Sequence, residues 1–143
     1  MMKRFFIFAI VVACCLFTLP AQRNAKGGVH TLSEKEFKAR IFDYSDTNSY
    51  YHGSTPIVVD FYADWCGPCR KLAPTMEELS KKYEGKVIFY KVDIEKSGDI
   101  SKAFAIDAIP TILYIKADVR PKRSVGFLTK DQLIEIIEKV LLD

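Results

Sequence analysis

The sequence predicts an α/β fold in which a central mixed β-sheet is flanked by helices on both faces. From residue 29 onward, strand-like and helix-like segments alternate, as in parallel strands joined by helical crossovers. Residues 56–63 are apolar except for Asp60, as expected for a strand buried on both faces. Near the end of the chain, a short link joins two strand-like segments directly, which predicts an antiparallel pair. The sheet should therefore contain both strand directions.

The first half of this domain should contain an edge strand, a short helix and a loop. Residues 29–32 are expected to form the strand, and a capping box of Ser33 and Glu36 should begin the helix. Apolar residues follow at helical spacing: Phe37, Ile41 and Tyr44. Residues 43–55 are polar and rich in turn formers, so we expect mostly loop there.

The longest helix should begin at Cys66, contain Pro74 as a source of a kink, and end at Gly85. A second capping box, Thr129 with Gln132, should begin the last helix. The remaining expected elements are a strand at 87–92, a short helix at 99–104, and strands at 111–115 and 123–126.

Composition fits one soluble domain. The 143 residues are enough for a single core, and 49% are hydrophobic and 27% charged. The formal net charge is +3, of which Lys3 and Arg4 supply two charges. The rest of the chain has 19 basic and 18 acidic residues, a balance too even to indicate a nucleic-acid-binding protein.

Residues 1–21 have the features of a secretory signal peptide. The basic pair Lys3-Arg4 precedes an apolar run over residues 5–19, which is shorter than the roughly 20 residues of a membrane-spanning helix. Cleavage after Ala21 would leave residues 22–28 as a polar linker before the folded domain at 29–143. We therefore predict a periplasmic or otherwise extracytoplasmic protein that is soluble after cleavage.

Two of the four cysteines, Cys14 and Cys15, lie inside this predicted signal. Residues 11–14 also resemble a lipoprotein box, in which Cys14 would carry the lipid. Apolar residues follow Cys14, whereas polar residues usually follow a lipidated cysteine. We therefore favour the soluble form over a membrane-anchored lipoprotein and leave the lipidation of Cys14 open.

The other two cysteines, Cys66 and Cys69, have the spacing of a reactive pair. Cys66 falls at a predicted helix start, where unpaired N–H groups and the helix dipole stabilise a thiolate. Cys69 lies on the first turn, close enough to form a disulfide with Cys66 or to attack a mixed disulfide. A crosslink that closes so short a loop stabilises a fold very little. The spacing therefore favours redox chemistry.

Two structural roles are the alternatives for this pair. A structural zinc site needs four ligands, and after the signal the chain offers only His30 and His52 besides the cysteines. Inert core cysteines are not expected at a helix start beside Gly67 and Pro68. We expect neither a metal nor another cofactor.

Residues 59–70, with the sequence VDFYADWCGPCR, resemble the active-site segment of the thioredoxin family. Pro74 matches the helix-kinking proline of that family, and Ile109-Pro110-Thr111 resembles the loop whose proline is cis and faces the disulfide. Val125-Gly126 matches a second loop that contacts substrate. The resemblance implies a thioredoxin fold over about residues 29–143. Residues 43–55 depart from it, since they are about ten residues longer than the usual link.

The resemblance also implies roles for single residues. Cys66 would be the nucleophile and Cys69 the resolving cysteine. Asp60 matches a buried acid beneath the disulfide, and burial should raise the pKa of its carboxyl so that it can accept a proton from Cys69. Lys91 matches a lysine that pairs with this acid; a solvated lysine at a strand end is the alternative. The expected substrate contacts are Trp65, Gly67, Pro68, Ile109, Pro110, Val125 and Gly126.

Together these features predict a protein-disulfide reductase that acts outside the cytoplasm. A disulfide oxidase or isomerase on the same fold is one alternative, and a redox-independent binding module is another. Pro68, directly before Cys69, has no side-chain donor, charge or N–H to stabilise the Cys66 thiolate, which favours the reductase. The expected partners are protein disulfide substrates and, by analogy, a membrane thiol carrier that supplies electrons. We expect a monomer and no nucleic-acid partner.

Overall fold

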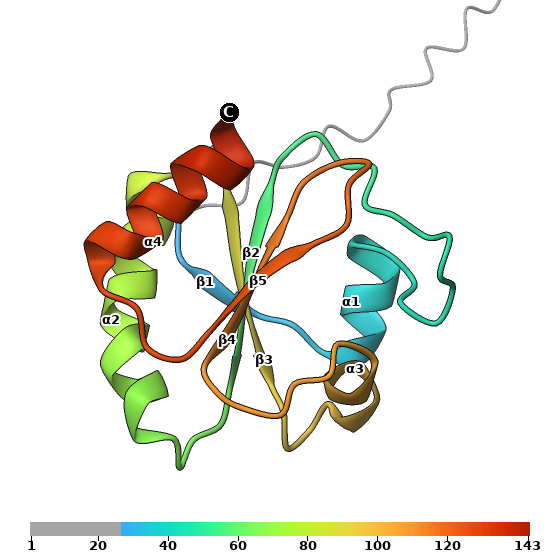
Figure 1. The fold of residues 1–143 in the computed structure, drawn as a ribbon, viewed down its shortest axis with the longest axis horizontal. Helices are drawn as coiled ribbons and strands as arrows, with labels where there is room; N and C mark the ends of the chain where they lie inside the picture. The colour runs from blue at the N-terminus through green and yellow to red at the C-terminus, as the bar shows by residue number, and fades with distance from the viewer. Residues whose placement is uncertain (1–26) are drawn as a thin grey trace, which may run out of the picture.

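The structure is a computed structural model that describes residues 27–143, so the predicted signal peptide with Cys14 lies outside the described residues. A five-stranded sheet forms its centre, with α1 and α3 over one face and α2 and α4 over the other (Figure 1). In chain order, the elements are β1 (Val29–Thr31), α1 (Glu34–Arg40), β2 (Ile57–Tyr62), α2 (Gly67–Lys82), β3 (Ile88–Asp93), α3 (Gly98–Ala103), β4 (Thr111–Ile115), β5 (Lys122–Val125), α4 (Lys130–Ile137) and a π-helical turn (Glu138–Leu142).

The sheet is mixed, as predicted. Its strand order is β1-β3-β2-β4-β5, with β3 parallel to both β1 and β2. Strand β4 runs antiparallel to β2 and to β5, which follows it after a short link. Strand β2 therefore lies in the middle of the sheet with a partner on each side, and its end at Tyr62 leads into the reactive cysteines.

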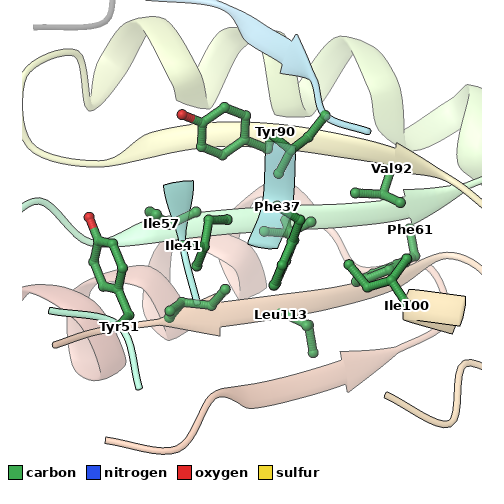
Figure 2. Close-up of a cluster of buried hydrophobic side chains, with 12 residues drawn as sticks. Phe37, Ile41, Tyr51, Ile57, Phe61, Tyr90, Val92, Ile100 and Leu113 are labelled. Atoms are coloured by element: carbon green, nitrogen blue, oxygen red, sulfur yellow. The ribbon is translucent and has the colours of Figure 1, made fainter. Parts of the chain in front are cut away.

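Alternation along β2 divides the core between the two faces of the sheet. Val59 and Phe61 pack with Phe37 of α1 and Ile100 of α3, in the cluster that Figure 2 shows. Val58, one residue earlier, packs on the opposite face with residues of α2 and α4, among them Leu72, Met76, Leu79 and Leu133. Because side chains of a strand alternate, Asp60 shares the face of Val58 and points towards α2.

Both predicted capping boxes are present, at Ser33 with Glu36 and at Thr129 with Gln132. Two details differ from the prediction. Helix α1 ends at Arg40, so Tyr44 lies beyond it and packs from the following segment onto Phe37, with 5.8 Å between the ring centroids. The last helix ends in the π-helical turn, whereas the apolar spacing in the sequence predicts a regular α-helix to the end.

Within residues 27–143, no helix is long and apolar enough to cross a membrane.

Candidate active site

The cysteine pair lies where β2 passes into α2. Cys66 is the N-cap residue of α2, and the backbone N–H of Cys69 donates to Cys66 Sγ at 3.2 Å. The two residues form a disulfide, with 5.3 Å between their Cα atoms. In the reduced protein, the same N–H and the positive end of the helix dipole would stabilise a thiolate on Cys66. The predicted helix-start position of Cys66 is confirmed.

The disulfide is buried, and the tryptophan that precedes it in the chain is exposed. Cys66 and Cys69 are only 3% and 4% exposed, so exposure does not distinguish the attacking cysteine from the resolving one. Trp65 is 64% exposed, a position from which its ring can meet another protein. What separates the two cysteines is their surroundings: Cys66 Sγ accepts the N–H of Cys69 at the helix start, while Cys69 lines a cavity that opens to the surface.

This cavity has a volume of about 210 Å³ and is lined by Asp60, Cys69, Ala73 and Lys91 among others. Asp60 is 5% exposed, and its Oδ1 is buried without a hydrogen-bond partner in the described part of the chain. Burial raises the pKa of the Asp60 carboxyl to about 7, although Lys91 opposes the shift. A carboxyl that titrates near neutrality beside Cys69 has the chemistry of a proton acceptor.

Lys91 lies opposite Asp60 on the neighbouring strand β3. Its ammonium group stands 5.3 Å from the centroid of the Tyr62 ring, and no ion pair joins it to Asp60 within the described residues. The lysine thus acts on the acid through space across the shared cavity, and the direct pairing expected from the resemblance is not formed.

The loop at Ile109-Pro110 lies beside the disulfide. The peptide bond before Pro110 is cis, as expected, and the carbonyl oxygen of Ile109 is 3.9 Å from Cys66 Sγ. Gly126 donates its N–H to the Pro110 carbonyl at 2.8 Å, and its φ of +91° suits a glycine. These contacts bring both predicted substrate loops to the cysteines. Gly67 and Pro68 lie at the start of α2, directly between the two cysteines.

Phe127, which follows Gly126, is not among the substrate contacts predicted from the sequence. It is 50% exposed, as is Val125, so apolar surface continues past the predicted substrate loop. A large apolar residue in the turn between β5 and the capping box of α4 was the available signal.

The zinc alternative finds no donor set within residues 27–143, where no group of three or more potential ligands comes together. His30 lies in edge strand β1, and His52 Nδ1 lies 2.7 Å from Asp118 Oδ1. A bridged cysteine pair at a helix start, above a buried acid, defines instead a thiol–disulfide oxidoreductase.

Comparison with known proteins gives the family. The thioredoxin family model matches residues 28–139. Thioredoxin of Borreliella burgdorferi is 48% identical over 109 residues, covering 76% of this chain and 93% of the relative. Thioredoxin 1 of Nostoc sp. is 33% identical over 103 residues, covering 72% and 96%. A solved structure of chloroplastic thioredoxin z has a TM-score of 0.68 at 30% identity, covering 81% and 96%.

The chain therefore belongs to the thioredoxin family and has its fold. It is a thioredoxin-type protein-disulfide reductase, in agreement with the sequence prediction.

Proposed function

We propose that this thioredoxin reduces protein disulfides outside the cytoplasm, with Cys66 as nucleophile and Cys69 as resolving cysteine. The observation that carries the assignment is the N–H of Cys69 directed at Cys66 Sγ. The Cys66 thiolate attacks one sulfur of the substrate disulfide, and the other substrate sulfur leaves as a thiolate. Cys69 then attacks Cys66 Sγ, which releases the second substrate thiolate and leaves the enzyme disulfide. Two electrons have passed from the enzyme to the substrate.

Asp60 supplies the proton acceptor for the second step. Cys69 must lose its proton to attack, and its side chain lines the same cavity as the Asp60 carboxyl. With a pKa of about 7, that carboxyl is partly ionised at neutral pH and can take the proton, directly or through water in the cavity. Lys91, with its ammonium group near the same cavity, favours the ionised form of the acid.

Substrate would meet the surface around Trp65, Ile109 and Val125. These residues come from the segment just before α2, the cis-proline loop and the end of β5, and two of them are half exposed or more. An extended substrate segment can lie along the backbone near Pro110 and Gly126 with its sulfur facing Cys66.

Pro68 favours reduction over oxidation as the direction of electron flow. It adds no donor or charge near Cys66, so the thiolate and hence the reduced form gain less stability than with a histidine at this position. Equilibration of the purified protein with glutathione buffers, followed by alkylation and mass spectrometry, should give a potential more reducing than that of the glutathione couple. Pro68→His should move the potential in the oxidising direction. A wild-type potential at or above the glutathione value would favour the oxidase or isomerase.

The proposal that the protein is exported is based on the sequence features of residues 1–21, and it can be tested independently of the disulfide chemistry. A reporter that is active only outside the cytoplasm should give signal when fused to these residues, and the same reporter without them should not. Mature protein should begin near Gln22 by mass spectrometry. A lipid on Cys14 would overturn the soluble form, and full-length cytosolic protein would overturn export.

An exported reductase is separated from cytoplasmic NADPH, so we infer that a membrane thiol carrier reduces its disulfide and that the protein works as a monomer. A carrier thiolate attacking Cys66 would form a mixed disulfide that Cys69 normally resolves. Cells with Cys69→Ser should therefore accumulate a covalent complex between this protein and a membrane protein. Absence of such a complex from the membrane fraction, or a dimer in analytical ultracentrifugation, would contradict these two inferences.

A further inference from the structure

A second cavity lies on the α1 and α3 face of the sheet, apart from the cysteines. Its volume is about 320 Å³, in the lower part of the range for small-molecule sites. It lies between residues 43–55, the end of α3 and the β4–β5 link, and its lining shares no residue with the cavity beneath the disulfide. Residues 43–55 are the segment that is longer than the thioredoxin resemblance implies, so this cavity belongs to a part of the chain that the redox function does not use.

Aromatic rings form its apolar side. Phe42, Tyr44 and Phe104 line the cavity, and all three pack around Phe37 of α1 with 5.5–5.8 Å between ring centroids. Tyr51, which also lines it, belongs to the buried cluster of Figure 2 and donates its hydroxyl hydrogen to the Thr55 carbonyl at 2.7 Å. The rings are held by the core, so the apolar side is formed before any ligand arrives.

The loop that lines one side of the cavity is held to the β4–β5 link. The N–H of Asp118 donates to the carbonyl of Tyr51 at 2.9 Å, and the Asp118 carboxylate meets His52 Nδ1 at 2.7 Å. Further along the same loop, Asp43 accepts the N–H of Ser45 at 2.9 Å. A loop tied in this way loses little freedom when a ligand binds.

Two arginines give the cavity a positive side. The guanidinium of Arg120 stands 5.7 Å from the ring centroid of Tyr50. Arg123 donates from Nη1 to the carbonyls of Phe104 and Ala105 at 3.1 and 3.3 Å, which orients its guanidinium. Within residues 27–143, neither arginine has a carboxylate within 4 Å. The acid on the lining, Asp46, accepts the N–H of Asn48 in its own turn.

We propose that this cavity binds a small aromatic carboxylate. The ring would lie against Tyr44 and Phe104, and the carboxylate would meet the guanidinium of Arg120, which has no carboxylate partner within residues 27–143 and whose planar fork matches a carboxylate. An ammonium ligand would face two guanidiniums, and a purely apolar ligand would make no use of the guanidinium of Arg120. The site is independent of the disulfide chemistry, so its ligand need carry no sulfur.

The test compares two probes of the same shape and opposite charge, 4-hydroxyphenylacetate and tyramine, titrated into ¹⁵N-labelled protein. The acid should give saturable shifts at the amides of Tyr50, Phe104 and Arg120, and should bind about tenfold more tightly than tyramine. Arg120→Gln should weaken binding of the acid by about the same factor. Lys122→Gln, which makes the same charge change at an exposed β5 residue outside the lining, should leave it unchanged.

Three results would overturn the proposal. One is shifts that do not saturate, or that centre on Trp65 and Cys66 instead of the cavity. Another is equal affinity for the acid and the amine, which would leave only an apolar cavity. The third is an equal effect of Arg120→Gln and Lys122→Gln, which would assign the binding to general positive charge. Arg120 is exposed, so loss of folding is not expected to obscure the result.

Discussion

Replacing Asp60 with asparagine should make the protein more stable, and more so as the pH rises. The Asp60 carboxyl has an ordinary pKa of 3.8 in the unfolded chain, and burial raises it to about 7 in the fold. Between these values the folded protein binds more protons than the unfolded chain, so its free energy of unfolding falls as pH rises from about 4 to 7. Asparagine has nearly the same shape and does not titrate, so the variant escapes this loss.

The magnitude follows from the size of the pKa shift. About three pKa units at 1.36 kcal/mol each give a loss of at most about 4 kcal/mol across the whole interval. Roughly 2–3 kcal/mol of this falls between pH 5 and pH 8. The cavity beside Asp60 and the opposing charge of Lys91 keep the loss from being larger.

Urea unfolding of the oxidised proteins at several pH values measures this difference. The stability of Asp60→Asn relative to wild type should increase by about 2–3 kcal/mol from pH 5 to pH 8. Asp93→Asn is the matched control, since Asp93 is also buried but is paired, with Lys96 at 3.1 Å and with the N–H of Glu95 at 3.0 Å. That variant should be destabilised by about 1–3 kcal/mol at pH 8. A stability difference for Asp60→Asn that stays constant with pH would refute the assignment of a raised pKa.

Three further predictions concern Glu34, Phe127 and the catalytic role of Asp60. Glu34 Oε1 accepts the N–H of Ile100 at the start of α3 at 2.8 Å, so Glu34→Ala should lower stability by about 1 kcal/mol, measured by urea unfolding against exposed Lys35→Ala. Phe127→Ala should lower kcat/KM for insulin but not for a small aromatic disulfide, because only the protein substrate is large enough to contact this exposed ring. Val119→Ala, at an equally exposed residue remote from the cysteines, should change neither value. Equal losses on both substrates would contradict a role of Phe127 in contacting protein substrates. Asp60→Asn should slow release of substrate from the mixed disulfide most strongly above pH 7, where wild-type Asp60 is ionised, and an unchanged pH profile in stopped-flow experiments would remove it from proton transfer.

The sequence predicts the sheet and the cysteine site well because both depend on strong local patterns. An apolar run over 56–63 that is rich in β-branched and aromatic residues is typical of a strand buried on both faces, and it forms β2 in the middle of the sheet. Asp60 is the one acid in that run, so strand alternation alone places it on a single face, here beneath α2. The helix start at Cys66 follows from the Gly-Pro pair after it, since Pro is favourable in the first turn.

Other features depend on contacts between distant residues and are not visible in local patterns. Tyr44 continues the helical spacing of Phe37 and Ile41 but lies beyond α1, because packing on Phe37 and Phe104 satisfies its ring equally well from a loop. The ammonium of Lys91 lies by Tyr62 at the end of a flexible side chain, so the strand register that places Lys91 opposite Asp60 does not by itself produce an ion pair. The arginine-lined cavity lies between residues 43–55 and the β4–β5 link, which are about 70 positions apart in the sequence. Local periodicity cannot predict that two such distant segments lie side by side.

The central claim, attack by Cys66 and resolution by Cys69, is tested most directly by trapping the intermediate. The Cys69→Ser and Cys66→Ser proteins are each reduced, freed of reductant and mixed with native insulin, whose disulfides are intact. The reaction is quenched with acid, and the intact adduct and its peptides are analysed by mass spectrometry. The Cys69→Ser protein should form a one-to-one adduct through Cys66, and the Cys66→Ser protein should form little or none. A stable adduct through Cys69, or equal adducts in both variants, would contradict the central claim.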